Sequence, residues 1–148
     1  MPTNCLFCRI VAGEIPASKV FEDDEVVAFL DLHPVNFGHS LIVPKAHHAT
    51  LADLPDALAM AVARQVPHLT RAILTATAAP GLNLVVNNGA VAGQTIDHVH
   101  WHLIPRFEGD AVDWPWPHLS YPESGLEAMR GRIVARLDGD SGSGESRG

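Results

Sequence analysis

The chain has 148 residues, of which 47% are hydrophobic, and this is enough for a single domain with a substantial core. Its formal net charge is −7 and its only lysines are Lys19 and Lys45, which argues against a basic surface for nucleic acids. The sequence has no apolar stretch of membrane-spanning length and no signal-peptide pattern before Cys5. We therefore expect a cytoplasmic protein with no nucleic-acid partner and no membrane partner.

The N-terminal segment holds both cysteines of the chain, Cys5 and Cys8, in a Cys-x-x-Cys spacing. Such a pair can be a redox centre, half of a zinc site or two unliganded thiols. A thioredoxin-like pair would follow a strand, whereas this one lies almost at the terminus. A zinc site needs two more ligands, and His47 and His98 are candidates, because His47 follows a predicted strand and His98 begins a run of histidines. The spacing alone leaves zinc and unliganded thiols open.

Three strands are predicted after a short helix over residues 9–12. Residues 20–21 and 26–30 flank an acidic turn and form a hairpin, and residues 40–44 form the next strand. Asp31 ends the second of these strands. A carboxylate at a strand end can accept two ribose hydroxyls, and a solvated loop aspartate is the alternative interpretation.

Residues 53–78 are predicted to form the main helix, because helix-forming residues dominate and apolar residues recur at helical spacing. Pro55 suits a first helical turn. Pro67 does not suit a helix interior, where proline removes a hydrogen bond and clashes with the preceding turn. We therefore expect a kink or a break between Ala63 and Pro67. A helix this apolar is either fully buried or paired with a partner.

Residues 82–86 are the next predicted strand.

The next stretch carries the candidate chemistry. Three histidines alternate there with three apolar residues, in the order His98, Val99, His100, Trp101, His102 and Leu103. This alternation predicts a strand with the imidazoles in one row and the apolar side chains in the core. The strand should end near Ile104, because Pro105 cannot donate to a sheet ladder. The histidines can be incidental, can bind a metal ion on the strand face, or can act on a phosphate ester.

A glycine-rich turn, residues 89–95, lies directly upstream of the histidines. Its glycines let the backbone approach a ligand closely, and exposed N–H groups in such a turn can make an anion-binding concavity. Gln94 and Thr95 add side-chain donors. Phosphate donors and a row of histidines are therefore neighbours in the sequence.

The C-terminal third is less informative. Residues 113–118 form an aromatic-proline loop with Trp114 and Trp116, which covers the core or an interface, or shapes a substrate pocket. Residues 123–137 are predicted to be an amphipathic helix. The last residues, 138–148, are rich in Gly, Ser and acidic side chains and are predicted to be a disordered tail, so that the single domain covers residues 1–137.

Several of these motifs together resemble the signature of the histidine triad (HIT) family of nucleotide hydrolases and transferases. The motifs are Asn87-x-Gly89, Ala92-Gly93-Gln94-Thr95 and His98-x-His100-x-His102-Leu103-Ile104-Pro105-Arg106. The similarity begins at Cys5 and is closest to bacterial, Hint-like members with an N-terminal Cys-x-x-Cys. It implies an α+β fold, namely an antiparallel sheet of about five strands with one long helix and a C-terminal helix. It also implies a homodimer that forms through the long helix.

The resemblance assigns catalytic roles as well. It implies that His100 attacks the α-phosphorus of a nucleotide and forms a nucleotidyl-histidine. It further implies a set of groups that bind the α-phosphate, consisting of His102, Gln94, Thr95 and the backbone near Gly93.

Three more residues are expected to bind the nucleotide on the same basis. Asp31 would contact the ribose, Leu32 the base, and Asn87 a non-bridging oxygen or the ribose edge. The family pattern also implies a structural zinc ion, with Cys5, Cys8, His47 and His98 as its ligands. The sequence assigns no role to His39, which precedes the predicted third strand.

The resemblance therefore predicts a hydrolase that cleaves purine nucleotide derivatives at the α-phosphate, with nucleoside phosphoramidates or dinucleoside polyphosphates as substrates. A nucleotidyl transferase or phosphorylase would share the same intermediate. A non-catalytic nucleotide-binding protein and a metal-storage or metal-sensing protein are further alternatives.

Overall fold

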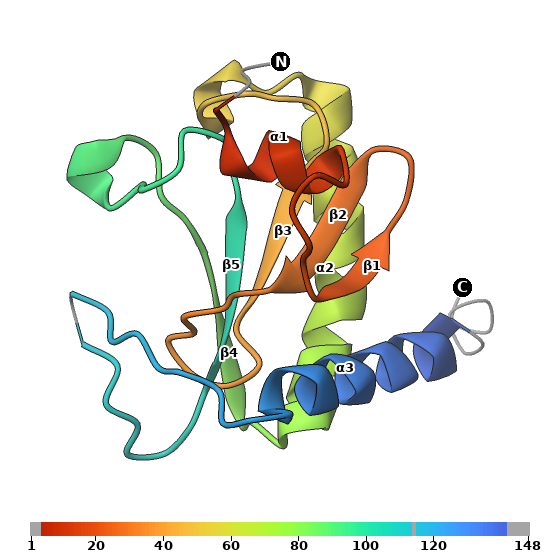
Figure 1. Cartoon of the computed structure of the whole chain (residues 1–148), viewed down its shortest axis with the longest axis vertical. Coiled ribbons are helices and arrows are strands. Elements are labelled where there is room, and N and C mark those ends of the chain that lie inside the picture. Colours follow the sequence, from red (N-terminus) through yellow and green to blue (C-terminus); the bar gives the residue numbers. More distant parts are fainter. Residues whose placement is uncertain (1–3, 114, 142–148) are drawn as a thin grey trace.

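The computed structural model describes residues 4–113 and 115–141, and these form an antiparallel sheet with helices packed on it (Figure 1). In chain order the elements are α1 (Leu6–Val11), β1 (Lys19–Glu22), β2 (Val26–Leu30), β3 (Ser40–Pro44), η1 (Leu51–Asp53), α2 (Asp56–Thr77), β4 (Gly81–Val86), η2 (Ala90–Ala92), β5 (Trp101–Arg106) and α3 (Gly125–Ser141). The strand order is β1-β2-β3-β5-β4, and every neighbouring pair is antiparallel. The predicted α+β fold, with about five strands, one long helix and a C-terminal helix, is confirmed.

Alternation along the strands builds a core on each face of the sheet. In β2, Val26, Ala28 and Leu30 pack with α2 and α3, whereas Val27 and Phe29 pack with α1 on the other face. Figure 1 shows α1 in front of the sheet and α2 behind it. All five residues of β2 are therefore buried.

The predicted orientation of the histidine-rich segment is confirmed on its apolar side, because Val99, Trp101 and Leu103 all lie in the core beneath α2. The strand itself differs from the prediction at both ends. It begins only at Trp101, so the first two histidines lie in the segment that leads into β5.

Pro105 lies inside β5, although the sequence predicted that this strand would end near Ile104. That prediction is wrong. The last pair between β3 and β5 joins Ser40 to Leu103, so beyond Leu103 the strand has only β4 beside it. At that point β5 is an edge strand on its β3 side, where proline is tolerated because no ladder donor is needed there.

The main helix is not broken. Helix α2 runs continuously with Pro67 inside it, and its start is preceded by the separate short helix η1. Proline removes only the hydrogen bond that its own N–H would donate one turn back. Packing stabilises the helix on both sides of that gap, because Leu58 and Val62 before the proline and Leu69 and Ile73 after it are all buried.

Helix α3 is longer than predicted. It continues to Ser141, so the first residues of the predicted tail, 138–141, are helical. The rest of that tail lies outside the described residues, and the domain bounds of 1–137 stay a prediction. None of the described helices is long and apolar enough to cross a membrane.

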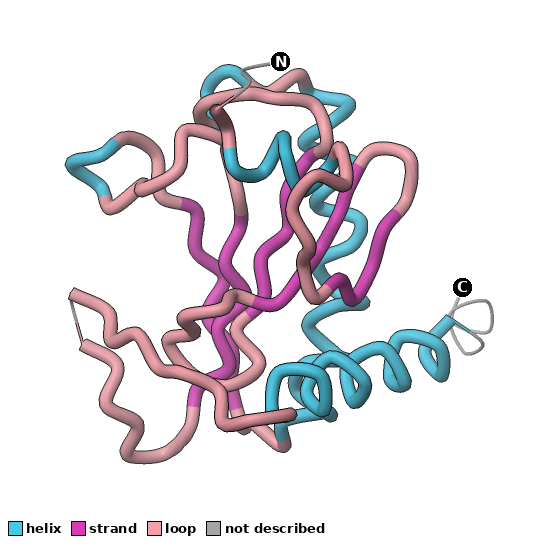
Figure 2. The backbone as a smooth tube through the Cα atoms, viewed as in Figure 1, coloured by secondary structure: helices cyan, strands magenta, loops and turns pink. Residues whose placement is uncertain are grey.

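The two connections that flank β5, residues 87–100 and 107–124, consist mostly of loop (Figure 2). The first carries the glycine turn and two of the three histidines, and the second carries the aromatic-proline segment. Both connections therefore start or end at β5, the strand that carries the third histidine.

Candidate active site and metal centre

A cleft of about 540 Å³ lies between α1, the end of β2 and the histidines around the start of β5. Much of its wall is apolar and comes from α1, the following loop and the sheet, with Phe7, Ile10, Ile15, Phe29 and Leu41 among its residues. The polar side chains are Ser18, Asp31, His33, Thr95, His100, His102 and His118. The described lining contains neither lysine nor arginine.

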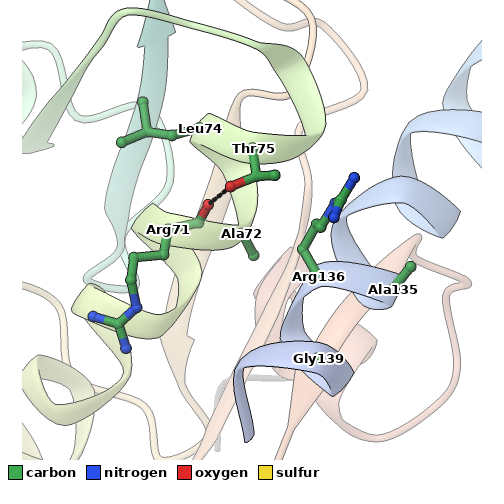
Figure 3. A pocket seen from close by; sticks show the side chains of 7 residues that line it. All are labelled: Arg71, Ala72, Leu74, Thr75, Ala135, Arg136 and Gly139. Atoms are coloured by element: carbon green, nitrogen blue, oxygen red, sulfur yellow. Dashed lines mark hydrogen bonds between the residues drawn. The ribbon is translucent and has the colours of Figure 1, made fainter. Parts of the chain in front are cut away.

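A second groove, of about 520 Å³, lies between α2 and α3 and shares no lining residue with the cleft (Figure 3). Figure 3 shows the side chains of Arg71 and Arg136 extending in different directions from their two helices. Thr75 donates its hydroxyl to the carbonyl oxygen of Arg71 at 2.9 Å, within its own helix. The titratable groups that could act together as acid, base and nucleophile are in the cleft, which is therefore the candidate active site.

His100 is held as a neutral imidazole with one free nitrogen. Its Nδ1 lies 2.8 Å from the carbonyl oxygen of His98 and must carry the proton, because a carbonyl can only accept. Burial lowers the pKa of His100, although that hydrogen bond opposes the shift. The lone pair is therefore on Nε2 of a cleft residue at neutral pH, which is the state that a nucleophilic imidazole requires.

The tautomer of His102 is determined by His39, a residue to which the sequence analysis assigned no role. The backbone N–H of Val35 donates to Nδ1 of His39 at 3.0 Å, so a neutral His39 carries its proton on Nε2. That nitrogen lies 2.9 Å from Nδ1 of His102 and donates to it. His102 consequently keeps its own proton on Nε2, as a donor that its ring can offer to a ligand.

The strand register could have identified His39. Leu41 pairs with His102 across the β3–β5 ladder, and His39 lies two residues before Leu41, diagonally opposite His102. Burial lowers the pKa of His39 to about 3 and that of His102 to about 4, so both rings are neutral at physiological pH.

Asp31 and Leu32 both line the cleft. Its Oδ1 accepts from the backbone N–H of His33 at 2.9 Å, and its Oδ2 is 3.8 Å from Nε2 of His39. Burial raises the pKa of Asp31. Leu32 is 58% exposed and can cover a ligand in the cleft without rearrangement of the core.

The glycine turn is organised differently from the prediction. The N–H groups of Ala92, Gly93 and Gln94 donate to carbonyl oxygens within the turn, so they do not form an open anion cradle. The Gln94 side chain is buried and its amide is fully used. It accepts from the N–H of Gly89 at 2.7 Å and donates to the carbonyls of Ala49 and Ile96 at 2.7 and 3.0 Å. Direct phosphate binding by Gln94 does not fit this arrangement.

Of the other residues predicted near the phosphate, some line the cleft and some do not. Thr95 is exposed and lines the cleft, whereas Asn87 and Gly93 are not among its lining residues. Lys45 pairs with Glu22 at 2.8 Å and is likewise not part of the cleft lining.

The aromatic-proline loop closes the site on one side. The ring of Trp116 lies edge-on to His102 with 5.3 Å between centroids. Nδ1 of His118 lies 3.3 Å from the carbonyl oxygen of His33, and the N–H of Leu119 donates to the carbonyl of Pro34 at 2.8 Å. Trp114 lies outside the described residues.

The predicted zinc ligands come together in a second cluster behind the cleft. The ligand atoms of Cys5, Cys8, His47 and His98 all lie within 4.8 Å of one another. Nδ1 of His98 is 3.4 Å from Sγ of Cys5 and 3.6 Å from Sγ of Cys8, and Nδ1 of His47 is 3.4 Å from Sγ of Cys8. Tetrahedral Zn²⁺, with bonds of about 2.3 Å to sulfur and about 2.0 Å to nitrogen, separates sulfur from nitrogen by roughly 3.5 Å.

The protonation states also suit a metal ion. Nε2 of His98 donates to the carbonyl of Pro44 at 2.7 Å, which leaves the lone pair on the Nδ1 that faces the thiols. Burial lowers the pKa of His98 to about 4, so this ring is neutral. Burial raises the pKa of the Cys8 thiol to about 11, and the adjacent Cys5 adds to that shift, so a metal ion has to displace a proton from this thiol. The positions of the four side chains offer a metal ion two sulfurs and two Nδ1 atoms.

Comparison with known protein families matches residues 12–109 to the HIT domain. The chain belongs to the HIT family. This HIT protein also has an N-terminal Cys-x-x-Cys segment, formed by Cys5 and Cys8.

Relatives with assigned activities share most of their length with this HIT protein. Adenylylsulfatase HINT3 of Arabidopsis thaliana is 46% identical over 91% of the chain and 68% of its own length. Adenosine 5'-monophosphoramidase HNT1 of Saccharomyces cerevisiae is 38% identical over 91% of the chain and 84% of its own length. Among solved structures, a zinc-bound histidine triad family protein from Mycobacterium smegmatis superposes with a TM-score of 0.83 at 31% identity, covering 95% and 97% of the two chains.

The buried neutral histidines predict a loss of stability in acid. In the unfolded chain histidine binds a proton near pH 6.5, whereas folded His39 does so only at about pH 3. The unfolded state therefore binds more protons below pH 6.5, and the free energy of unfolding falls by up to about 1.4 kcal/mol per pH unit for each such residue. Urea unfolding between pH 7 and 4.5 should show a smaller slope for His39→Asn than for wild type. The Thr95→Ala variant, which removes no titratable group, should keep the wild-type slope, and equal slopes in all three proteins would contradict the assignment.

Gln94 and Thr95 should differ in how much each contributes to the stability of the fold. Gln94→Ala leaves the N–H of Gly89 and two carbonyls without their partner, so the free energy of unfolding should fall by about 1–3 kcal/mol. Thr95→Ala removes an exposed side chain and should change it by less than about 0.5 kcal/mol. Chemical denaturation of both variants tests this. Equal stabilities would show that the Gln94 amide is not needed by the turn.

Proposed function

We propose that this HIT protein is a nucleotide hydrolase that cleaves purine nucleotide derivatives at the α-phosphate through a nucleotidyl-histidine on His100. The observation that carries the proposal is the hydrogen bond from Nδ1 of His100 to the carbonyl oxygen of His98, at 2.8 Å. It leaves a neutral ring with its lone pair on Nε2.

The first step forms a bond between Nε2 of His100 and the α-phosphorus and breaks the bond from phosphorus to the leaving group. The leaving group departs with the electron pair of that bond and, if it is an amine, takes up one proton from solvent water. In the second step water bonds to phosphorus and gives up one proton to solvent, the phosphorus–nitrogen bond breaks with its electron pair returning to Nε2, and the nucleoside monophosphate is released. Nδ1 of His100 keeps its proton throughout and donates it to the His98 carbonyl. The ring is therefore cationic while it carries the nucleotidyl group, and it leaves as the same neutral tautomer.

The rest of the cleft fits the parts of such a substrate. The N–H on Nε2 of His102 and the hydroxyl of Thr95 are donors for the α-phosphate oxygens, where charge develops in the transition state. The carboxylate of Asp31 is an acceptor for ribose hydroxyls. The apolar wall formed by α1 and the sheet suits a purine base, with Leu32 covering it.

The two curated relatives support the choice of a hydrolase. Both are named for reactions at an adenosine phosphate, one as an adenylylsulfatase and the other as an adenosine 5'-monophosphoramidase. We therefore propose adenosine 5'-phosphoramidate and adenylyl sulfate as the first substrates to test.

Intact-mass measurement after brief mixing with these two substrates tests the covalent step. Wild type should carry a transient adenylyl adduct and release AMP, whereas His100→Asn should form no adduct and lose on the order of 10⁴-fold or more in turnover. His68→Asn, on α2, is the matched control and should behave as wild type.

Three other results would contradict the mechanism or the reaction. An adduct on His100→Asn would place the nucleophile elsewhere. Binding of AMP without any adduct or turnover would indicate a non-catalytic nucleotide-binding protein. Formation of ADP in the presence of inorganic phosphate, in place of AMP, would indicate a phosphorylase.

We further propose that the cluster of Cys5, Cys8, His47 and His98 binds one structural Zn²⁺ ion. Two thiolates and two imidazoles form a closed set that leaves no position for substrate. A zinc-bound family member with a closely similar fold supports this choice of metal. The ion would fix α1 against the segment that carries His98.

Metal analysis of protein purified without chelator should give about one zinc ion per chain. His47→Asn should lose most of that zinc, because it removes a ligand that lies 3.4 Å from Sγ of Cys8. The neighbouring variant His48→Asn is the control and should retain it. A clean zero for wild type, or zinc loss from the control instead, would refute the ligand set.

We propose a homodimer that forms through α2, as the family resemblance implies, together with the edge of the sheet at β4. Among the described strands β4 has only β5 beside it, and Leu84 on β4 and Met60 on α2 are 47% and 64% exposed. Sedimentation at micromolar concentration should give a dimer for wild type and a monomer for Leu84→Asp. Leu51→Asp, a similarly exposed leucine outside β4, should remain dimeric. A monomeric wild type would refute the proposal.

A further inference from the structure

Helix α1 contributes to both sites at once. Cys5, at its N-terminal cap, and Cys8 belong to the metal cluster. Leu6 and Phe7, which lie between these two cysteines, and Ile10 one turn later line the nucleotide cleft. Any displacement of α1 therefore changes the positions of metal ligands and of the cleft wall together.

This helix cannot set its own position. It has six residues, whereas isolated helices shorter than about 12 residues are marginal in water. Inside α1, Sγ of Cys5 accepts from the N–H of Cys8 at 3.4 Å. The orientation of α1 therefore depends on its tertiary contacts. These are the metal cluster, the apolar core on this face of the sheet and any ligand bound in the cleft.

The ring of Phe7 connects the two sites directly. It is 2% exposed and meets His98 and His100 edge-on, with centroid distances of 5.8 and 5.0 Å. His98 belongs to the metal cluster and His100 is the proposed nucleophile. The same two histidines are joined a second time by the 2.8 Å hydrogen bond from Nδ1 of His100 to the His98 carbonyl.

We infer that the metal ion and the nucleotide bind cooperatively, and that Phe7 carries much of the coupling as a positioning residue. The inference rests on the proposed nucleotide site and the proposed zinc site. A metal ion on the cluster fixes α1 and His98, so a nucleotide then meets a cleft wall and a nucleophile that are already in place. By reciprocity, a bound nucleotide holds α1 against the cluster and strengthens metal binding by the same factor.

The rate of zinc release tests this on the loaded protein, without a metal-free form that must stay folded. Zinc transfer to an excess of a coloured chelator is followed by absorbance, with and without saturating AMP. AMP should slow release from wild type by about 5-fold or more, the lower end of typical coupling between sites. Phe7→Leu keeps an apolar side chain but removes the ring, and AMP should slow its zinc release less than 2-fold.

Phe29→Leu is the matched control. The Phe29 ring packs against Phe7 at 5.6 Å and lines the same cleft, but among the described ring contacts it meets neither histidine. It should weaken AMP binding and yet keep the wild-type slowing once AMP is saturating. The ratio of rates therefore separates coupling from simple loss of affinity or packing.

The outcomes also separate this inference from the proposals beneath it. If AMP does not bind to wild type, the nucleotide site fails, and if no zinc is present, the metal site fails. If both bind and AMP leaves the release rate unchanged, the coupling is refuted. If Phe7→Leu keeps the same slowing as Phe29→Leu, the role of Phe7 is refuted.

Discussion

The chemistry of this protein depends on one buried side chain and its backbone, those of His98. Its Nε2 proton goes to the carbonyl of Pro44, its Nδ1 lone pair faces Cys5 and Cys8, and its carbonyl accepts from Nδ1 of His100. Each of these contacts fixes the next one. Because Nε2 is tied to β3, Nδ1 can only be an acceptor or a metal ligand, and because the backbone is held there, the carbonyl is aimed at the next histidine of the row.

The same physical rule extends to the other side of the site. A neutral imidazole has one donor and one acceptor nitrogen, so a hydrogen bond at one end determines what the other end can do. The N–H of Val35 determines which nitrogen of His39 carries the proton, and His39 in turn determines the tautomer of His102. The carbonyl of His98 determines the tautomer of His100 in the same way. Burial is required for this, because it keeps the rings neutral, and a protonated ring would donate from both nitrogens. The cluster formed by Asp31, His39 and His102 has the spacing of a metal site, but its two imidazole nitrogens already share a proton at 2.9 Å.

Local patterns in the sequence predicted part of the fold, and they failed where long-range contacts decide. Alternation correctly put Val99, Trp101 and Leu103 in the core. The four candidate zinc ligands also converge, but that set came from the family resemblance, because no local pattern joins Cys5 to His98 across 93 residues. The break that the sequence allows at Pro67 does not occur, because the helix is held by packing on both sides of the proline. The hydrogen bonds of Gln94 also depend on distant contacts, because nothing in the turn itself shows that Ala49, 45 residues earlier, supplies a carbonyl for the amide. The role of His39 required the register of β3 against β5, which no local pattern contains.

The composition of the cleft limits how it can recognise an anion. The described lining has no lysine or arginine, Asp31 adds a carboxylate, and the chain as a whole carries a net charge of −7. The described lining of the proposed nucleotide site therefore offers no fixed positive charge to a phosphate. In the proposed site, affinity would come from burial of the base against the apolar wall, with short-range donors such as His102 and Thr95 aligning the phosphate. In such a site the orientation of each neutral donor matters more than its charge, which is why the fixed tautomers of His100 and His102 bear directly on catalysis.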